Sequence, residues 1–278
     1  CGRGRCTTCR VILEEGADLI HPPSAAEARS LRAVGAPPNA RLACQIRPTN
    51  PMTVFRVFQP DGKRGRAHAS QGTEQELAVL FLDIRGFTAR TTGQLPYDVV
   101  FLLNRFFDAI VPAVTNNGGT VDKYLGDGFL ALFETRNAES SAHAALAAVQ
   151  EIGQALEDYN ARMQAEGAQP IAIGLGLHLG DVVIGEIGAT GNAPRTLIGD
   201  TVNTASRLES KTKELGVQLL ISDSVLQAAG YDTAEASLQA LELRGLDAPL
   251  SALALHRSLD LDTTLAALPQ RESPAAAE

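Results

Sequence analysis

Two aspartates that end apolar segments are the feature that most constrains this 278-residue chain. The first is Asp83, which closes an unbroken apolar run over residues 77–82. A run of that length is typical of a buried strand, and Gly86 then predicts a turn. Asp83 is therefore predicted to lie at the exit of a strand.

The second aspartate, Asp127, lies between two further apolar segments. Residues 121–125 and 129–133 are separated by Gly-Asp-Gly, which predicts a hairpin with Asp127 at its tip. Carboxylates held on rigid strand ends suit Mg²⁺ or Mn²⁺. Asp-Gly is also ordinary turn chemistry, so each aspartate taken alone leaves both interpretations open.

Charge divides the chain into two parts. The whole sequence has 24 Lys and Arg against 32 Asp and Glu, a net charge of −8, yet its first 72 residues carry 11 basic against 5 acidic side chains. The change falls in a polar stretch with Pro60 and the sequence Lys-Arg-Gly-Arg at 63–66, so we expect a linker over 59–74 between two domains. A basic patch of this size is usually a solvated face, and we expect no nucleic-acid partner.

All four cysteines lie near the beginning of the chain, with the spacing Cys1-x₄-Cys6-x₂-Cys9 and then Cys44. Three thiolates from one tight turn and a fourth from a later segment suit a [2Fe–2S] cluster. A Cys₄ zinc site and structural disulfides are the rival interpretations.

Four further motifs follow one another along the chain: Phe-Leu-Asp-Ile-Arg-Gly-Phe-Thr (81–88), Lys-Tyr-Leu-Gly-Asp-Gly (123–128), Gly-Leu-His-Leu-Gly-Asp-Val-Val (176–183) and Ile-Gly-Asp-Thr-Val-Asn-Thr-Ala-Ser-Arg (198–207). In this order they closely resemble the class III nucleotidyl cyclases, over about residues 75–258. The resemblance implies an α+β fold, a ferredoxin-like class III nucleotidyl cyclase domain whose sheet is covered by helices. We expect helices over 99–114 and 140–165 on that sheet, and His178 to be a strand histidine without a catalytic role.

For the metals, the resemblance implies two Mg²⁺ or Mn²⁺ ions per site, bound by Asp83, Asp127 and the backbone carbonyl of Ile84. Amides of the turn at Gly86, Phe87 and Thr88 are then placed to hold phosphate oxygens.

The helix expected from an Asp200 N-cap through about residue 214 carries Asn203 and Arg207 on one face. By resemblance, Asn203 orients the ribose and Arg207 pairs with the α-phosphate of ATP. An Arg207 that pairs only with nearby carboxylates is the alternative.

The resemblance implies that Lys123 and Thr196 select the nucleotide base and favour adenine. Thr196 is also an ordinary residue for a strand, which is the alternative. The family's phosphate-binding lysine near the last hairpin is missing, and Arg244 is the candidate substitute. Metal residues of one subunit face the base-reading residues of another in this family, so we expect a homodimer.

The segments Cys-Thr-Thr-Cys-Arg-Val (6–11) and Leu-Ala-Cys-Gln (42–45) resemble the sequences around the cluster cysteines of plant-type ferredoxins. In that family a strand pair and a helix precede the cluster loop, whereas this sequence begins at Cys1. We therefore expect residues 1–58 to form a partial β-grasp [2Fe–2S] domain, with a strand near 10–15, a helix near 25–34 and a strand around 41–47. Its redox partner is unknown.

The sequence begins without an initiator methionine, so a longer parent protein is expected. We expect a cytoplasmic location, with membrane attachment only through an upstream segment. Residues 259–278 are rich in alanine and are expected to form a flexible tail. The rival functions are a non-catalytic nucleotide-binding regulator with a metal-bound N-terminal domain, and an electron-transfer protein.

Overall fold

The computed structural model describes residues 7, 9–16, 20–57, 73–186, 194–234 and 236–271. The chain divides into two compact units. The first unit comprises residues Cys1–Thr73 and Gly185–Thr196, and the second comprises Glu74–Ile184 and Leu197–Glu278. Most of the predicted linker, residues 58–72, lies outside the described residues.

The first unit has a small antiparallel sheet and one helix. Strand β1 (Arg10–Glu15) is central, between β2 (Ala40–Leu42) and β3 (Thr53–Arg56), and helix α1 (Ala25–Ala33) packs against β2. The first predicted strand and the predicted helix are confirmed. The strand predicted over 41–47 is wrong in extent, because a turn closed by the Gln45 N–H and the Leu42 carbonyl ends it at Leu42.

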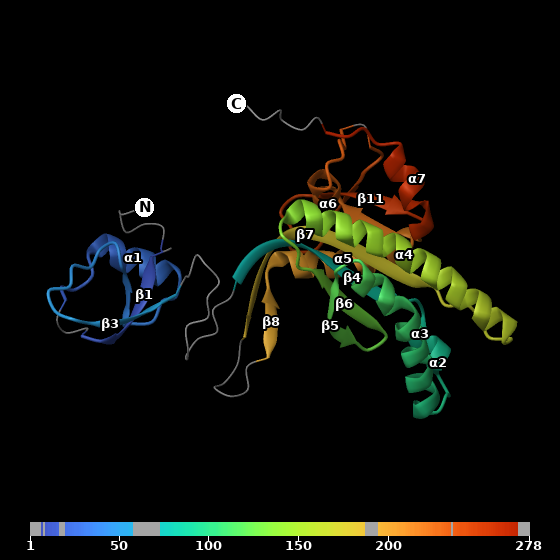
Figure 1. The fold of residues 1–278 in the computed structure, drawn as a ribbon, viewed down its shortest axis with the longest axis horizontal. Coiled ribbons are helices and arrows are strands. Elements are labelled where there is room, and N and C mark those ends of the chain that lie inside the picture. The colour runs from blue at the N-terminus through green and yellow to red at the C-terminus, as the bar shows by residue number, and fades with distance from the viewer. Residues whose placement is uncertain are drawn as a thin grey trace. The chain divides into compact units, whose positions relative to one another are not determined.

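A mixed sheet forms the centre of the second unit, in the order β10-β11-β9-β7-β4-β6-β5, with β8 also paired to β7 (Figure 1). The pairs β4–β6, β5–β6, β9–β11 and β10–β11 are antiparallel, and β7–β9 is parallel. The strands are β4 (Thr73–Ile84), β5 (Thr120–Leu125), β6 (Gly128–Phe133), β7 (Ile173–Glu186), β8 (Arg195–Ile198), β9 (Leu219–Ser222), β10 (Gln239–Leu241) and β11 (Leu250–Leu255).

Helices cover both faces of this sheet, which explains why β4 is apolar without alternation. Alternate β4 residues such as Leu80 and Leu82 join the core cluster under the long helices α3 (Pro96–Asn116) and α4 (Ala138–Ala165). Leu77 and Val79 belong to a second cluster with Ala205 of α5 (Asp200–Leu215). Both long helices predicted from the sequence are confirmed. The short helices are α2 (Phe87–Thr91), α6 (Asp223–Ala228) and α7 (Leu261–Ala266).

The prediction of a flexible tail from residue 259 is wrong for residues 259–271. After the 3₁₀ turn Ser258–Asp260, α7 buries Leu261 completely and Leu265 almost completely in the main core. The Arg271 N–H then donates to the Gly230 carbonyl at 2.7 Å. This segment is therefore part of the second unit.

Candidate functional site

Strand pairing brings the two predicted metal-binding aspartates together. Leu82 of β4 pairs with Phe129 of β6, which places Asp83 beside the turn that carries Asp127. The hairpin predicted at 126–128 is confirmed: Gly126 adopts φ 72°, and β5 pairs with β6 up to Leu125 and Gly128. A β-carbon at Gly128 would lie only 2.9 Å from Asp83 Oδ1, so the missing side chain lets the two strand ends approach.

The charges of this pair are unfavourable without a cation. Burial raises the pKa of Asp83, and the nearby Asp127 carboxylate raises it further, while Arg85 opposes the shift. In the described part of the chain, no group of three or more His, Cys, Asp or Glu side chains could hold a metal ion. Two carboxylates and the Ile84 carbonyl are an all-oxygen set that fits Mg²⁺ or Mn²⁺ bound together with substrate phosphates.

The predicted phosphate turn follows directly. Gly86 has φ 64° and precedes α2, whose first residues are Phe87 and Thr88. Gly86 and Thr88 are exposed, whereas Phe87 packs against the main core. The phosphate contacts of these amides stay a prediction.

Helix α5 presents Asn203 and Arg207 one turn apart. Its N-cap is Gly199 and Asp200 is its first helical residue, so the prediction of an Asp200 N-cap is wrong by one position. A β-carbon at position 199 would lie 2.7 Å from the Asp181 carbonyl, which favours glycine there. Asn203 is exposed and Arg207 is half-buried.

Arg207 lies over the connection between β10 and β11. A β-carbon at Gly245 would come within 3.2 Å of an Arg207 guanidinium nitrogen. The adjacent Arg244 is exposed. The structure thus brings together Arg207 and the segment that carries the candidate phosphate-binding Arg244.

The predicted base-reading residues lie on different strands. Lys123, on β5, has its Nζ 3.3 Å from Asp122 Oδ2. Thr196, on β8, is half-buried and donates a hydrogen bond to the Pro194 carbonyl at 3.1 Å. Thr196 belongs to the first unit and Lys123 to the second.

His178 lies in β7, as predicted, and is half-buried. Its Nδ1 is 2.8 Å from the Ser222 hydroxyl oxygen. Burial lowers the pKa of His178 to about 4, so the ring is neutral at physiological pH.

Two of the four predicted cluster cysteines fall in the described residues. Cys9 and Cys44 pack against the core formed by Leu31 and Leu42. The Ala43 N–H donates to the Cys9 carbonyl at 2.8 Å, which brings the segments of the two cysteines side by side. Cys1 and Cys6 lie outside the described residues. The iron–sulfur site therefore stays a prediction.

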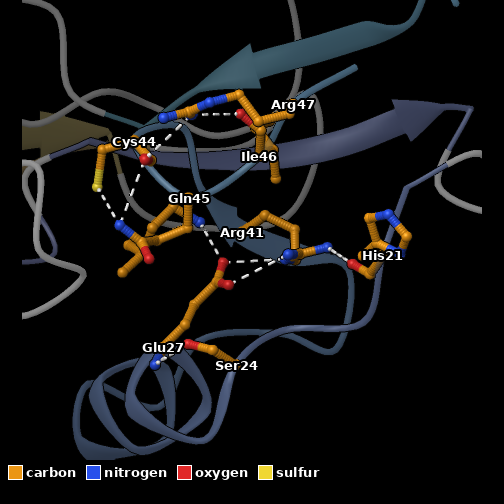
Figure 2. A network of polar contacts seen from close by, with 9 residues as sticks. His21, Ser24, Glu27, Arg41, Cys44, Gln45, Ile46 and Arg47 are labelled. Carbon is orange, nitrogen blue, oxygen red and sulfur yellow. Dashed lines mark hydrogen bonds and ion pairs between the residues drawn. The ribbon is translucent and has the colours of Figure 1, made fainter. Parts of the chain in front are cut away.

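A buried ion pair that sequence patterns did not predict fixes the segment before Cys44 (Figure 2). Glu27 of α1 is 1% exposed and Arg41 is 7% exposed. Glu27 accepts from Arg41 Nε at 2.9 Å and from the Leu42 N–H at 2.8 Å, and Arg41 Nη1 donates to the His21 carbonyl at 2.7 Å. Gln45 Nε2 donates to Cys44 Sγ at 3.4 Å on the following turn. The pair thus joins α1 to the strand that leads to Cys44.

None of the helices among the described residues is both long enough and apolar enough to cross a membrane.

The family of the chain follows from its similarity to known proteins. Residues 69–249 match the model of the adenylate and guanylate cyclase catalytic domain. The chain belongs to this family. An adenylate cyclase of Anabaena cylindrica is 33% identical over 177 residues, which cover 64% of this chain and 35% of that protein. Adenylate cyclase 1 of Rhizobium meliloti is 35% identical over 157 residues, covering 55% of this chain and 23% of that protein.

Solved structures of the cyclase family have the same fold. The guanylyl cyclase Cya2 aligns with a TM-score of 0.58 and 28% identity, over 74% of this chain and 97% of that one. The adenylyl cyclase CyaB from P. aeruginosa aligns with a TM-score of 0.55 and 26% identity, over 66% of this chain and 94% of that one. Relatives of both base specificities therefore resemble this chain.

Proposed function

We propose that the chain is an adenylate cyclase that converts ATP to 3′,5′-cyclic AMP and pyrophosphate. The observation that carries the proposal is the convergence of Asp83 and Asp127 at one end of the sheet, in a chain of the cyclase family. The reaction forms a bond between the ribose 3′-oxygen and the α-phosphorus. It breaks the bond to the pyrophosphate oxygen, and the 3′-hydroxyl proton is released.

Each side chain has a distinct task in this proposal. Asp83, Asp127 and the Ile84 carbonyl hold two divalent ions, which, when bound, neutralise phosphate charge and lower the pKa of the 3′-hydroxyl. Arg207 donates to the α-phosphate as negative charge builds there, and Asn203 orients the ribose. The remaining contacts to the triphosphate come from the amides at 86–88 and from Arg244.

Adenine is the proposed base because Lys123 and Thr196 match the adenylate-type residues of the family. The competing substrate is GTP, since a guanylyl cyclase is among the structural relatives. A site built to pair with one base edge rejects the other strongly, by up to about 10⁴–10⁵, because buried polar groups stay unpaired. A clear preference for ATP over GTP is therefore expected.

A second copy of this chain is the proposed partner, with metal residues from one subunit and Asn203 and Arg207 from the other. Exposed apolar side chains beside the carboxylate hairpin support an interface there: Tyr124 is 53% exposed and Leu125 is 47% exposed. The Tyr124 ring also contacts Phe107, with centroids 4.7 Å apart. Such a face is better covered by a partner than left in water.

For the first unit we propose a regulatory [2Fe–2S] cluster on Cys1, Cys6, Cys9 and Cys44. The adjacent placement of the Cys9 and Cys44 segments supports a shared ligand site. A longer protein that supplies the upstream half of the ferredoxin fold, purified anaerobically, should contain roughly two irons per chain, and Cys44→Ser should remove them. Stoichiometric zinc without iron would instead establish a structural Cys₄ zinc site.

Alanine at Asp83 or Asp127 tests the catalytic proposal. Cyclic AMP formation from ATP and Mn²⁺ should fall by about 10³-fold or more in either variant, because a metal ligand is lost. Asp158→Ala is the matched control, since Asp158 lies on the exposed side of α4, where it accepts a hydrogen bond from Gln154 Nε2 at 3.0 Å. Near-normal turnover of Asp83→Ala at saturating Mn²⁺ would contradict the site. Nucleotide binding without turnover in the unaltered chain would favour a non-catalytic regulator.

A further inference from the structure

Arg85 links the metal-binding end of β4 to helix α5. It follows Asp83 by two residues, and its Nη1 lies 3.2 Å from Glu209 Oε1 on α5. Its Nη2 also donates to the Thr212 hydroxyl, one turn further along the same helix. The Arg85 N–H donates to the Ala172 carbonyl at 2.8 Å, which fixes the backbone from which the side chain departs.

Two glycines of β7 make room for this link. A β-carbon at Gly174 would lie 2.5 Å from Arg85 Cζ, so any other residue would displace the guanidinium. A β-carbon at Gly176 would lie 2.8 Å from the Cα of Glu209, so this glycine lets α5 approach the sheet closely. The Arg85 side chain therefore crosses β7 in a space that only glycine provides.

The Arg85–Glu209 ion pair is largely shielded from water and interacts electrostatically with the carboxylates of the metal site. The side chains of Arg85 and Glu209 are 21% and 10% exposed. Burial raises the pKa of Glu209, Arg85 lowers it, and Asp83 and Asp127 raise it. Arg85 thus lowers the pKa of two carboxylates, Asp83 at the metal site and Glu209 on α5.

We propose that Arg85 and Glu209 are positioning residues that hold the Asn203 and Arg207 face of α5 in register with the metal-binding end of β4. The inference rests on the proposed function. In the proposed homodimer the two ends serve different active sites, because Asp83 of each chain contributes to one composite site and Arg207 of the same chain contributes to the other. The ion pair then couples the two active sites through the body of each subunit.

A heterodimer with a single functional active site, called the live site below, separates the positioning of α5 by Arg85 from a local effect of Arg85 on metal binding. One chain carries Asp83→Ala and supplies α5 to the live site, and the other carries Arg207→Ala and supplies the carboxylates. Arg85→Gln is added only to the Asp83→Ala chain, whose own metal site is already lost. The kcat should fall about tenfold or more, because misplaced α5 side chains fit the transition state poorly. The Mn²⁺ dependence and the KM for ATP should stay unchanged.

Two further variants on the same chain test whether the pair acts as a unit. Glu209→Gln added to Arg85→Gln should cause little additional loss, since the contact is already broken. Arg85→Lys should restore activity only in part, because an ammonium group does not reach Glu209 and Thr212 together as the guanidinium fork does. The matched control is Arg257→Gln, which removes the exposed Arg257–Glu157 pair of the same unit and should leave kcat unchanged.

An unchanged kcat with Arg85→Gln on the Asp83→Ala chain would overturn the inference. If no active heterodimer forms although the unaltered chain turns over ATP, the proposed composite site is wrong. The role of the Arg85–Glu209 pair is then tested by hydrogen exchange alone. In the Arg85→Gln homomer, amides of residues 203–212 should exchange faster than in the unaltered chain, whereas the Arg257→Gln chain should match it. Equal exchange in all three would refute the link.

Discussion

Gly128→Ala should abolish the proposed cyclase activity by moving Asp83. The added β-carbon would lie 2.9 Å from Asp83 Oδ1 and 3.2 Å from the Asp83 Cα, and it would also overlap the Leu82 carbonyl. Most of these atoms belong to the backbone, so a change of rotamer does not relieve the overlap, and β4 and β6 must separate. Overpacking of this kind costs about 1–3 kcal/mol. A shift of the carboxylate by about 1 Å is expected to lower kcat by about 10²-fold.

Gly118→Ala separates this effect from a loss of stability. Gly118 has φ 76° with no atom within 4 Å of an added β-carbon, so alanine there costs about 1–2 kcal/mol of backbone strain without a clash. Both variants should lower the melting temperature by roughly 2–4 °C per kcal/mol. Only Gly128→Ala should lose turnover with saturating Mn²⁺ and ATP. Equal turnover of the two variants at a temperature where both are folded would refute the reasoning.

Three further outcomes follow from buried groups. Leu265→Ala should destabilise the second unit by about 2–5 kcal/mol in thermal unfolding, whereas a truly flexible tail would show no change. Glu27→Ala should weaken the first unit by about 3–5 kcal/mol, because Arg41 is left buried and unpaired, and should speed exchange of the Leu42 amide. Arg41 lowers the pKa of Glu27 despite the opposing effect of burial, so this stabilisation is complete above the ordinary value of 4.5 and is lost as pH falls through the lowered value. His178 should destabilise the fold by up to about 3 kcal/mol as pH falls from 6.5 to about 4, since the buried ring must stay neutral, and His178→Gln should flatten the melting temperature over that range.

Local sequence patterns predicted the parts of the site that depend on a few adjacent residues. An apolar run that ends at Asp83 and a Gly-Asp-Gly hairpin were enough to place both carboxylates, because strand length and turn chemistry are local properties. The long helices were predictable for the same reason. The sequence favours Asp200 as the N-cap of α5, one residue too late, because aspartate is a common cap, whereas a close approach to the Asp181 carbonyl selects Gly199.

Contacts between distant segments were not predictable from one sequence. Arg85 and Glu209 are 124 positions apart, and their pairing depends on strand order and on space left by glycines of β7. The Glu27–Arg41 pair likewise requires α1 to pack on β2. Helix α7 is not evident from the sequence because its six residues include only two leucines, Leu261 and Leu265, that indicate a buried face. These features result from tertiary packing, which overrides local composition.

Turnover of the unaltered chain tests the central claim most directly. Purified protein should be incubated with ATP or GTP and Mn²⁺, and the cyclic nucleotide and pyrophosphate measured together. The proposed function predicts equal amounts of cyclic AMP and pyrophosphate from ATP, a far lower rate with GTP, and loss of both products in Asp83→Ala. Preferential formation of cyclic GMP would contradict the assignment of Lys123 and Thr196 to adenine, and nucleotide binding without either product would contradict the cyclase assignment itself.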